Sequence, residues 1–268
     1  MTHMLIKAKT LRGYSLLCLD GEIGKVEEFY FDDHHWTIRY LIAETGGWLT
    51  GWQVLISPYA MTTVNKEEQN ISINLTKKQI EESPLLESDK PVSRQYEESY
   101  YGYYGWPLYW GGADMWGLSP YIESGLNSRT AGHTANNKNR SSDLHSKHSW
   151  DPNLRSTKAV SGYGIHAADG EIGHVDDFII DDETWAIRYL VIDTQNWWPG
   201  KKILIAPSWI SSISWEDSKI FIDLPRETIK LSPEYTDESL LTREYENRLH
   251  IHYNRHDYWV KEPSDKEN

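Results

Sequence analysis

Alternating apolar and polar positions predict a chain built mainly from short β-strands. An apolar run at residues 14–19 is closed by Asp20-Gly21, which suits a tight turn because both residues tolerate positive φ. Further strands are predicted at residues 26–31, 36–43 and 54–56, and residues 71–75 alternate with a period of two. Several short strands over about 80 residues are typical of a small twisted barrel.

A short helix is predicted after the last of these strands. Thr76 and Gln79 have the spacing of a capping box, in which two side chains satisfy free backbone N–H groups. In the second half of the chain Pro225 takes the place of Thr76, and proline also favours a helix start. Both helices are expected to end before a Ser-Pro pair, at residues 83–84 and 232–233.

The two halves of the chain repeat each other. Residues 13–110 align without a gap with residues 162–259, and the shared blocks keep their order and spacing. They include DGEIG at 20–24 and 169–173, a pair of aspartates at 32–33 and 181–182, IRYL at 38–41 and 187–190, Arg-x-Tyr-Glu at 94–97 and 243–246, and Tyr-Trp at 109–110 and 258–259. Self-similarity of this kind indicates a tandem duplication.

The repeat predicts four parts of the chain. Each copy is expected to fold as one domain, and a polar stretch almost free of large apolar side chains separates them, which favours a flexible linker. We expect the two copies to pair about a pseudo-twofold axis, and a homo-oligomer is possible. The predicted parts are residues 1–112 (first domain with an aromatic extension), 113–154 (linker), 155–260 (second domain) and 261–268 (polar tail).

Composition narrows the class of protein. The net charge of −13 argues against a nucleic-acid partner, because both copies would repel a phosphate backbone. Cys18 is the only cysteine, which excludes intrachain disulfides and suggests a small buried side chain. We expect neither a transmembrane segment nor a signal peptide, and a cytoplasmic location is the simplest interpretation.

The repeated motifs resemble those of PRC-barrel domains. This family is named after the cytoplasmic part of the photosynthetic reaction centre H subunit, and it is similar to the C-terminal barrel of a ribosome maturation factor. The resemblance rests on DGEIG, the acidic turn, IRYL and the Leu-Ile-x-Pro blocks at 55–58 and 204–207, and it covers roughly residues 5–85 and 155–235. It implies a β-barrel scaffold used for protein contacts, without shared catalytic residues. The chain shows neither the membrane helix of the H subunit nor the separate N-terminal barrel of the maturation factor.

Charged residues recur within the two copies. The aspartates at the predicted acidic turns could bind a cation, but turn geometry explains them more simply, because Asp side chains bond to nearby backbone amides. These residues are Asp32, Asp33, Asp181 and Asp182. Arg39 and Arg188 lie within predicted strands, where a structural ion pair is favoured over an anion site.

No pattern in the sequence predicts catalysis or a cofactor. There is no nucleophile elbow, phosphate-binding loop or dinucleotide fingerprint. If residues 250–256 formed a strand, His250, His252 and His256 could approach a metal ion, although the spacing alone gives no consistent geometry. The chain is therefore expected to be neither an enzyme nor a metalloprotein.

Aromatic residues are the most distinctive feature of the chain, with 13 Trp and 17 Tyr but only 4 Phe. Residues 100–117 are rich in Tyr, Trp and Gly, and they could form either an exposed docking surface or an arm packed on a barrel. The residues without an aromatic counterpart in the other copy are the candidates for partner contact, namely Tyr100, Tyr101, Tyr103, Trp106 and Trp116.

These patterns together predict a mainly β protein of two tandem small barrels, each with a short helix, joined by a polar linker. The function they favour is a non-enzymatic module that binds a protein partner or supports an assembly. The alternative is a regulatory protein that binds a small ligand or metal at the acidic turns or between the barrels.

Overall fold

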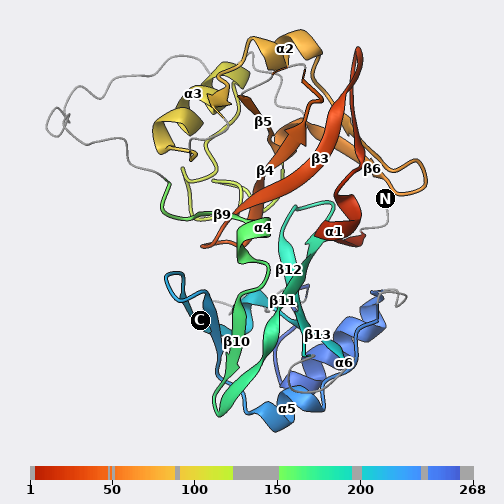
Figure 1. Ribbon diagram of the computed structural model, residues 1–268, viewed down its shortest axis with the longest axis vertical. Coiled ribbons are helices and arrows are strands. Elements are labelled where there is room, and N and C mark those ends of the chain that lie inside the picture. Colours follow the sequence, from red (N-terminus) through yellow and green to blue (C-terminus); the bar gives the residue numbers. More distant parts are fainter. Residues whose placement is uncertain are drawn as a thin grey trace, which may run out of the picture. The chain divides into compact units, whose positions relative to one another are not determined.

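The computed structural model describes residues 4–47, 49, 52–87, 91–122, 151–194, 201–236 and 241–259. The fold is mainly β, as predicted, and the chain divides into two compact units (Figure 1). Unit 1 comprises residues 1–158 together with residues 180–187, and unit 2 comprises residues 159–179 and 188–268.

Unit 1 contains a sheet in the order β6-β7-β2-β3-β4-β5-β8, in which β9 also pairs with β3. Neighbouring strands run antiparallel except β2 and β7, which are parallel. The strands are β1 (Leu5–Lys7), β2 (Ser15–Cys18), β3 (Gly21–Asp32), β4 (Thr37–Glu44), β5 (Trp52–Ile56), β6 (Met61–Asn65), β7 (Asn70–Ile73), β8 (Leu86–Glu87) and β9 (Leu154–Ser156). The helices are α1 (Ala8–Leu11), the 3-10 turn η1 (Pro58–Ala60), α2 (Lys77–Glu81) and α3 (Arg94–Tyr104).

The second copy repeats this order of elements. Its sheet follows the path β13-β12-β11-β10-β15-β14, which corresponds strand for strand to β5-β4-β3-β2-β7-β6. The parallel pair recurs as β10 and β15. The strands are β10 (Gly164–Ala167), β11 (Gly170–Asp181), β12 (Ile187–Asp193), β13 (Lys202–Ile205), β14 (Ile210–Ser214) and β15 (Lys219–Ile222). The helices are α4 (Thr157–Val160), η2 (Pro207–Trp209), α5 (Arg226–Lys230) and α6 (Arg243–Tyr253).

The DGEIG motif has a structural explanation in both copies. Asp20 and Asp169 accept a hydrogen bond from the first backbone N–H of the following helix, at 2.8 Å from Lys77 and 2.7 Å from Arg226. Gly24 adopts a φ of 144°, and a Cβ at this position would lie 2.1 Å from the carbonyl oxygen of Glu44. The motif therefore caps a helix and allows two strands to approach closely.

The core of unit 1 lies around β3 and β4. Seven consecutive residues of β4, from Thr37 to Ala43, are buried, so this strand is covered on both faces. Phe29, Phe31 and Ile38 are fully inaccessible, and each such side chain contributes about 1.5–3 kcal/mol by its removal from water. Cys18 is also buried as predicted, and burial followed by the charge of Asp20 raises the pKa of its thiol to about 11.

Short-range signals predicted helices α2 and α5 correctly. The capping box at Thr76 is present, since its hydroxyl accepts from the backbone N–H of Gln79 and the Gln79 side chain accepts from the Thr76 N–H. Pro225 stands at the N-cap of α5, and α2 and α5 both end before their Ser-Pro pairs.

The sequence patterns did not predict helices α3 and α6. Residues 94–104 were interpreted only as an aromatic extension, yet they form α3, capped by the Ser93 hydroxyl and ended by Gly105 at a φ of 71°. The stretch with His250 was considered as a strand, but it belongs to α6, which begins after Thr242 and ends at Asn254. The two helices are the same element of the repeat.

The predicted domain limits also change. The first unit extends to Lys158 instead of 112, because residues 113–122 and 151–158 pack against it. Trp116 and Asp151 are buried, and β9 pairs with β3. Residues 180–187 also belong to unit 1 and not to the second domain. The middle of the predicted linker, residues 123–150, and the predicted tail, residues 261–268, lie outside the described residues.

Candidate functional site

A buried arginine in the middle of β4 organises the first part of the site. Arg39 is fully inaccessible, and its Nε donates to Asp32 Oδ2 at 2.6 Å. This is the structural ion pair that the sequence favoured for Arg39. The guanidinium also lies over the ring of Tyr109 at 3.9 Å and that of Trp116 at 4.7 Å. Arg39 therefore attaches the loop after α3 to the sheet through cation–π contacts.

The four candidate aspartates lie in turns or immediately before them, where they bond to backbone or to arginine. Asp32 Oδ1 accepts from the backbone N–H groups of His34 and His35 at 3.2 and 2.8 Å. Asp181 Oδ1 does the same with Glu183 and Thr184 at 3.0 and 3.2 Å. Asp33 accepts from Arg155 at 2.9 Å, and Asp182 accepts from the backbone of Met4 at 2.8 Å. Asp32 and Asp181 thus bond to nearby backbone amides as the turn interpretation requires, whereas Asp33 and Asp182 bind residues that are distant in the sequence.

A second buried cluster surrounds Glu97 of α3, which is fully inaccessible. The hydroxyl of Tyr40 donates to Glu97 Oε1 at 3.0 Å, and that of Tyr109 lies 2.8 Å from the same oxygen. Arg94 pairs with Glu97 Oε2 at 3.1 Å and with Asp151 Oδ2 at 2.9 Å. Burial first, and then the charge of Asp151, raises the pKa of Glu97 to about 8.

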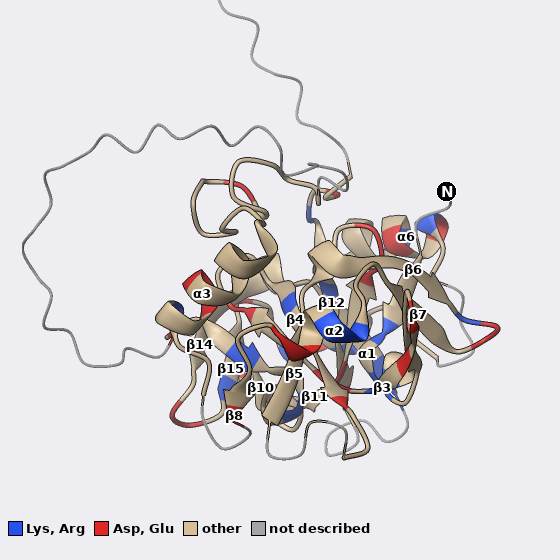
Figure 2. Cartoon of the chain, turned by 90° about the horizontal axis from the view of Figure 1, so that it is seen from above, with Lys and Arg blue, Asp and Glu red and all other residues tan. Residues whose placement is uncertain are grey.

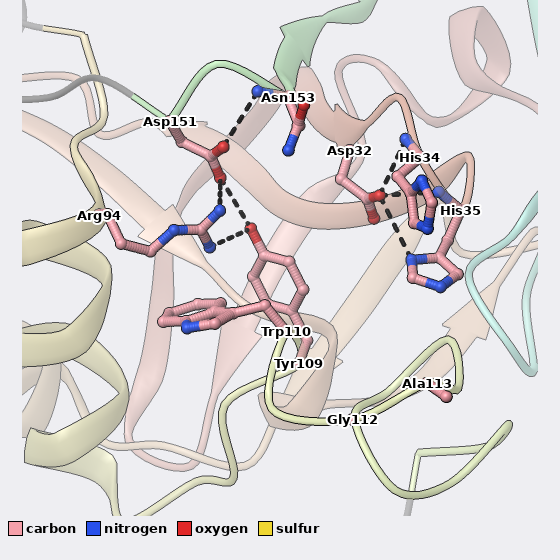
Figure 3. A pocket seen from close by; sticks show the side chains of 10 residues that line it. All are labelled: Asp32, His34, His35, Arg94, Tyr109, Trp110, Gly112, Ala113, Asp151 and Asn153. Carbon is pink, nitrogen blue, oxygen red and sulfur yellow. Dashed lines mark hydrogen bonds and ion pairs between the residues drawn. The ribbon is translucent and has the colours of Figure 1, made fainter.

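A cavity of about 260 Å³ opens beside this cluster (Figure 3). The side chains drawn in Figure 3 come from the turn after β3, from α3, from the loop after α3 and from the segment before β9. Its lining residues are Asp32, His34, His35, Arg94, Tyr109, Trp110, Gly112, Ala113, Asp151 and Asn153.

The carboxylates of this cavity are already engaged. Both oxygens of Asp32 accept hydrogen bonds, from Arg39 and from the turn backbone. Asp151 Oδ1 accepts from the backbone N–H of Asn153 at 3.0 Å, and its Oδ2 contacts Arg94 and Tyr109. Within the described residues, no three His, Cys, Asp or Glu side chains gather closely enough to hold a metal ion.

Unit 2 contains the counterpart of the glutamate cluster. Glu246 of α6 accepts from Tyr189 at 3.0 Å and from Tyr258 at 2.8 Å, and it pairs with Arg243 at 2.9 Å. His250, at the position of Tyr101 in the first copy, lies 3.0 Å from the Tyr189 hydroxyl. His250 thus belongs to a buried hydrogen-bond network.

The five aromatic residues proposed from the sequence for partner contact differ in how deeply they are buried. Tyr100, Tyr101 and Trp116 are buried within unit 1, where the Tyr100 hydroxyl donates to the Leu55 carbonyl at 2.7 Å and the Trp116 indole donates to the Thr184 carbonyl at 3.0 Å. These three side chains do not form the exposed surface that we considered for them. Trp106 is half-buried and stacks on Tyr104, while Tyr103 is exposed.

An apolar groove lies on the outer side of this aromatic packing. It has a volume of about 410 Å³, and its floor includes Tyr59 and Trp116. Leu118 and Tyr121 at its edge are 88% and 54% exposed. The loop that carries most of these residues has one charged side chain, Asp114, and is almost wholly tan in Figure 2. The lining residues are Tyr59, Pro107, Leu108, Gly111, Trp116, Leu118, Ser119 and Tyr121.

The fold defines a small, mostly β module whose sheet order, bulged first hairpin and capped short helix occur in both copies. The family model of the PRC-barrel domain matches residues 161–229, which begin directly after α4 and include most of α5. The second half of the chain therefore contains a segment that matches a PRC-barrel domain. No curated protein matches the chain. None of the described helices is long and apolar enough to cross a membrane.

The sequence patterns include some of these site residues but assign them no role. Arg94 and Glu97 belong to a repeated block, and Tyr109 is a repeated aromatic residue. Their recurrence at fixed spacing was the available signal. Asp151 has no counterpart in the other copy of the cluster, so no pattern in the sequence could identify it.

Proposed function

We propose that this protein is a non-enzymatic binding module, and that the apolar groove of unit 1 takes a partner protein. Both copies repeat the same elements, so we also assign the first copy to the PRC-barrel type, as a tandem pair. A role in protein contacts agrees with what the family resemblance implies for such barrels.

The observation that carries this proposal is the exposure of the groove residues above a fixed aromatic floor. Leu118 and Tyr121 remain in contact with water, although a contiguous apolar surface is costly to expose. Beneath them, Trp116 is held by Arg39 and by its bond to Thr184, and Tyr59 packs against Trp116 with ring centroids 5.1 Å apart. Rigid aromatic side chains lose little conformational freedom on binding, which favours affinity.

The groove favours an apolar side chain of the partner over a polar or charged one. The indole N–H of Trp116 is already bonded to a backbone carbonyl, so it has no proton left for a ligand. Ser119 supplies the one side-chain hydroxyl among the lining residues apart from the two tyrosines. A protein that inserts leucine-like or aromatic side chains fits this surface.

The alternative, a regulatory protein for a small ligand or metal, has less support. The acidic turns use their carboxylates in hydrogen bonds and ion pairs, as does the cavity beside Glu97. The binding-module proposal uses a surface that is exposed and whose floor is fixed in place.

Affinity capture of the tagged protein from its own cells tests the proposal. We expect a stoichiometric protein partner with the wild-type chain, and a loss of at least about tenfold in recovery with Leu118→Glu, because a buried charge in an apolar contact is strongly unfavourable. Leu19→Glu is the matched control, since Leu19 is similarly exposed at 67% and does not line the groove. Equal capture by both variants, or recovery of the protein alone, would contradict the proposal.

A further inference from the structure

The segment that leads from unit 1 into unit 2 is attached to unit 1 by several contacts. β9 pairs with β3, so that Arg155 lies opposite Phe31. The backbone N–H of Asp33 donates to the Asn153 carbonyl at 2.9 Å, and the Phe29 N–H donates to the Thr157 hydroxyl at 3.3 Å. Asp151 stands at the start of this attachment, with its carboxylate in the Glu97 cluster. The Glu97 cluster therefore holds the start of this segment, at Asp151.

One hydroxyl group faces both carboxylates of this cluster. The Tyr109 hydroxyl lies 2.8 Å from Glu97 Oε1 and 3.1 Å from Asp151 Oδ2, but it has one proton to donate. Its oxygen also accepts from Arg94 at 3.4 Å, so the same arginine contacts the hydroxyl and both carboxylates.

The cluster contains more carboxylates than cations. Asp32 pairs with Arg39 at 2.6 Å, so Arg94 is the cation left to face both Glu97 and Asp151. Both carboxylate side chains have no accessible surface, and a surplus negative charge in such a place is costly. A proton on Glu97 removes that surplus.

Phenols, two imidazoles and a paired arginine also surround the cluster. Tyr40 of β4, Tyr101 of α3 and the Tyr109 hydroxyl face it, and burial raises the pKa of each of these phenols. His34 and His35 lie across the cavity, and Arg155 is paired with Asp33. Burial and the neighbouring Asp151 raise the pKa of Glu97 to about 8, in agreement with the geometry.

We propose that Glu97 holds a proton near neutral pH, and that this proton acts as a latch that keeps the segment Asp151–Lys158 attached to unit 1. Loss of the proton leaves two buried negative charges against one arginine. Asp151 then gains by moving into water, because Glu97 is fixed within α3. The latch is conformational and not catalytic, since neither carboxylate side chain is accessible to a substrate. It does not depend on the groove or on its partner.

The sign of the pH dependence follows from the raised pKa of Glu97. When Asp151 moves away, Glu97 loses the charge that helps to raise its pKa, so between its lower pKa in the open state and its pKa of about 8 in the closed state, the closed state binds one proton more. The attachment is therefore strongest below this window and weakens as pH rises through it toward 8. Above that pH the dependence levels off.

Hydrogen exchange with mass spectrometry on the full chain tests the latch, with exchange times corrected for the intrinsic effect of pH. Between about pH 6 and pH 8.5 we expect protection of residues 151–158 to fall by about tenfold or more in the wild type. Glu97→Gln keeps the cluster neutral at this position and should remove most of that dependence. Glu98→Gln, on the exposed face of the same helix, should behave like the wild type.

Two outcomes would overturn the proposal. One is protection of residues 151–158 that does not change with pH in the wild type, and the other is an equal loss in Glu97→Gln. Asp151→Asn serves as the second variant if Glu97→Gln does not fold. Infrared spectroscopy gives an independent readout: a protonated buried carboxyl band at neutral pH must be present in the wild type and absent in the folded variant.

Discussion

The two copies build one cluster with different additional partners. In both, a glutamate of the long helix (α3 or α6) contacts two tyrosine hydroxyls and pairs with the arginine three residues earlier. In unit 1 the cluster is completed by Asp151, which comes from outside the repeated positions. In unit 2 the additional partner is His250, on the helix itself. The first cluster therefore contains a second carboxylate, whereas the second cluster contains an imidazole.

This difference shows that a repeated motif can keep the same packing while the charge balance of the cluster changes. Arg94 and Arg243 each lie 4.1 Å above the ring of the tryptophan that follows the cluster tyrosine, so the hydrophobic part of the arrangement is the same. The charge balance differs because one neighbour at an unrepeated position is enough to change it. The following predictions compare equivalent residues, from the largest expected effect to the smallest.

Replacement of the strand arginines should give the largest difference in stability between the two copies. Arg39→Met leaves Asp32 buried without its cation and removes two cation–π contacts, so we expect a loss of about 3–5 kcal/mol. Arg188→Met should cost less, because Arg188 is half-buried whereas Arg39 is fully inaccessible. Calorimetry of both variants measures this difference, and equal losses would contradict the role given to Arg39.

Removal of the tyrosine hydroxyls tests the glutamate clusters themselves. Tyr109→Phe removes a hydroxyl that contacts both Glu97 and Asp151, and we expect a loss of about 2–3 kcal/mol. Tyr258→Phe removes a contact with one carboxylate at a more exposed position and should cost about 1 kcal/mol. Urea unfolding checks both values. A larger loss for Tyr258→Phe would show that Asp151 does not strengthen the first cluster.

Removal of the helix caps should destabilise α3 and α6 by the same amount. The hydroxyls of Ser93 and Thr242 accept from the backbone N–H groups of Tyr96 and Tyr245 at 3.2 and 3.3 Å. Ser93→Ala and Thr242→Ala should each cost about 1 kcal/mol, because one helix N–H loses its partner. Local hydrogen exchange in α3 and α6 measures the effect. A much larger loss in one copy would mean that its cap also supports the cluster.

Several features of the fold could be predicted because they depend on neighbouring residues. The DGEIG turn, the Thr76 capping box and the helix ends before Ser-Pro are all local, and the structure confirms them. The pairing of Arg39 with a carboxylate followed from the high cost of an unpaired buried charge. The mainly β class followed from the period-two pattern of apolar residues.

The helices α3 and α6 were missed because their composition hides their periodicity. Tyr96, Tyr100 and Tyr104 recur every fourth residue, which is a helical spacing, but the run of Tyr and Gly around them resembles an irregular aromatic segment. The candidate contact residues were therefore judged by their type alone. Burial of Tyr100, Tyr101 and Trp116 depends on strands and loops that are distant in the sequence.

The sequence by itself determined the duplication, the order of the strands within each copy and the turns that join them, because these depend on residue patterns within short stretches. Only the tertiary structure decided which aromatic residues are exposed and which carboxylate completes each cluster. Asp151 lies 54 residues from Glu97 in the sequence, yet both contact the same tyrosine hydroxyl. Burial and charge balance are properties of all neighbours in space, and no local pattern records them.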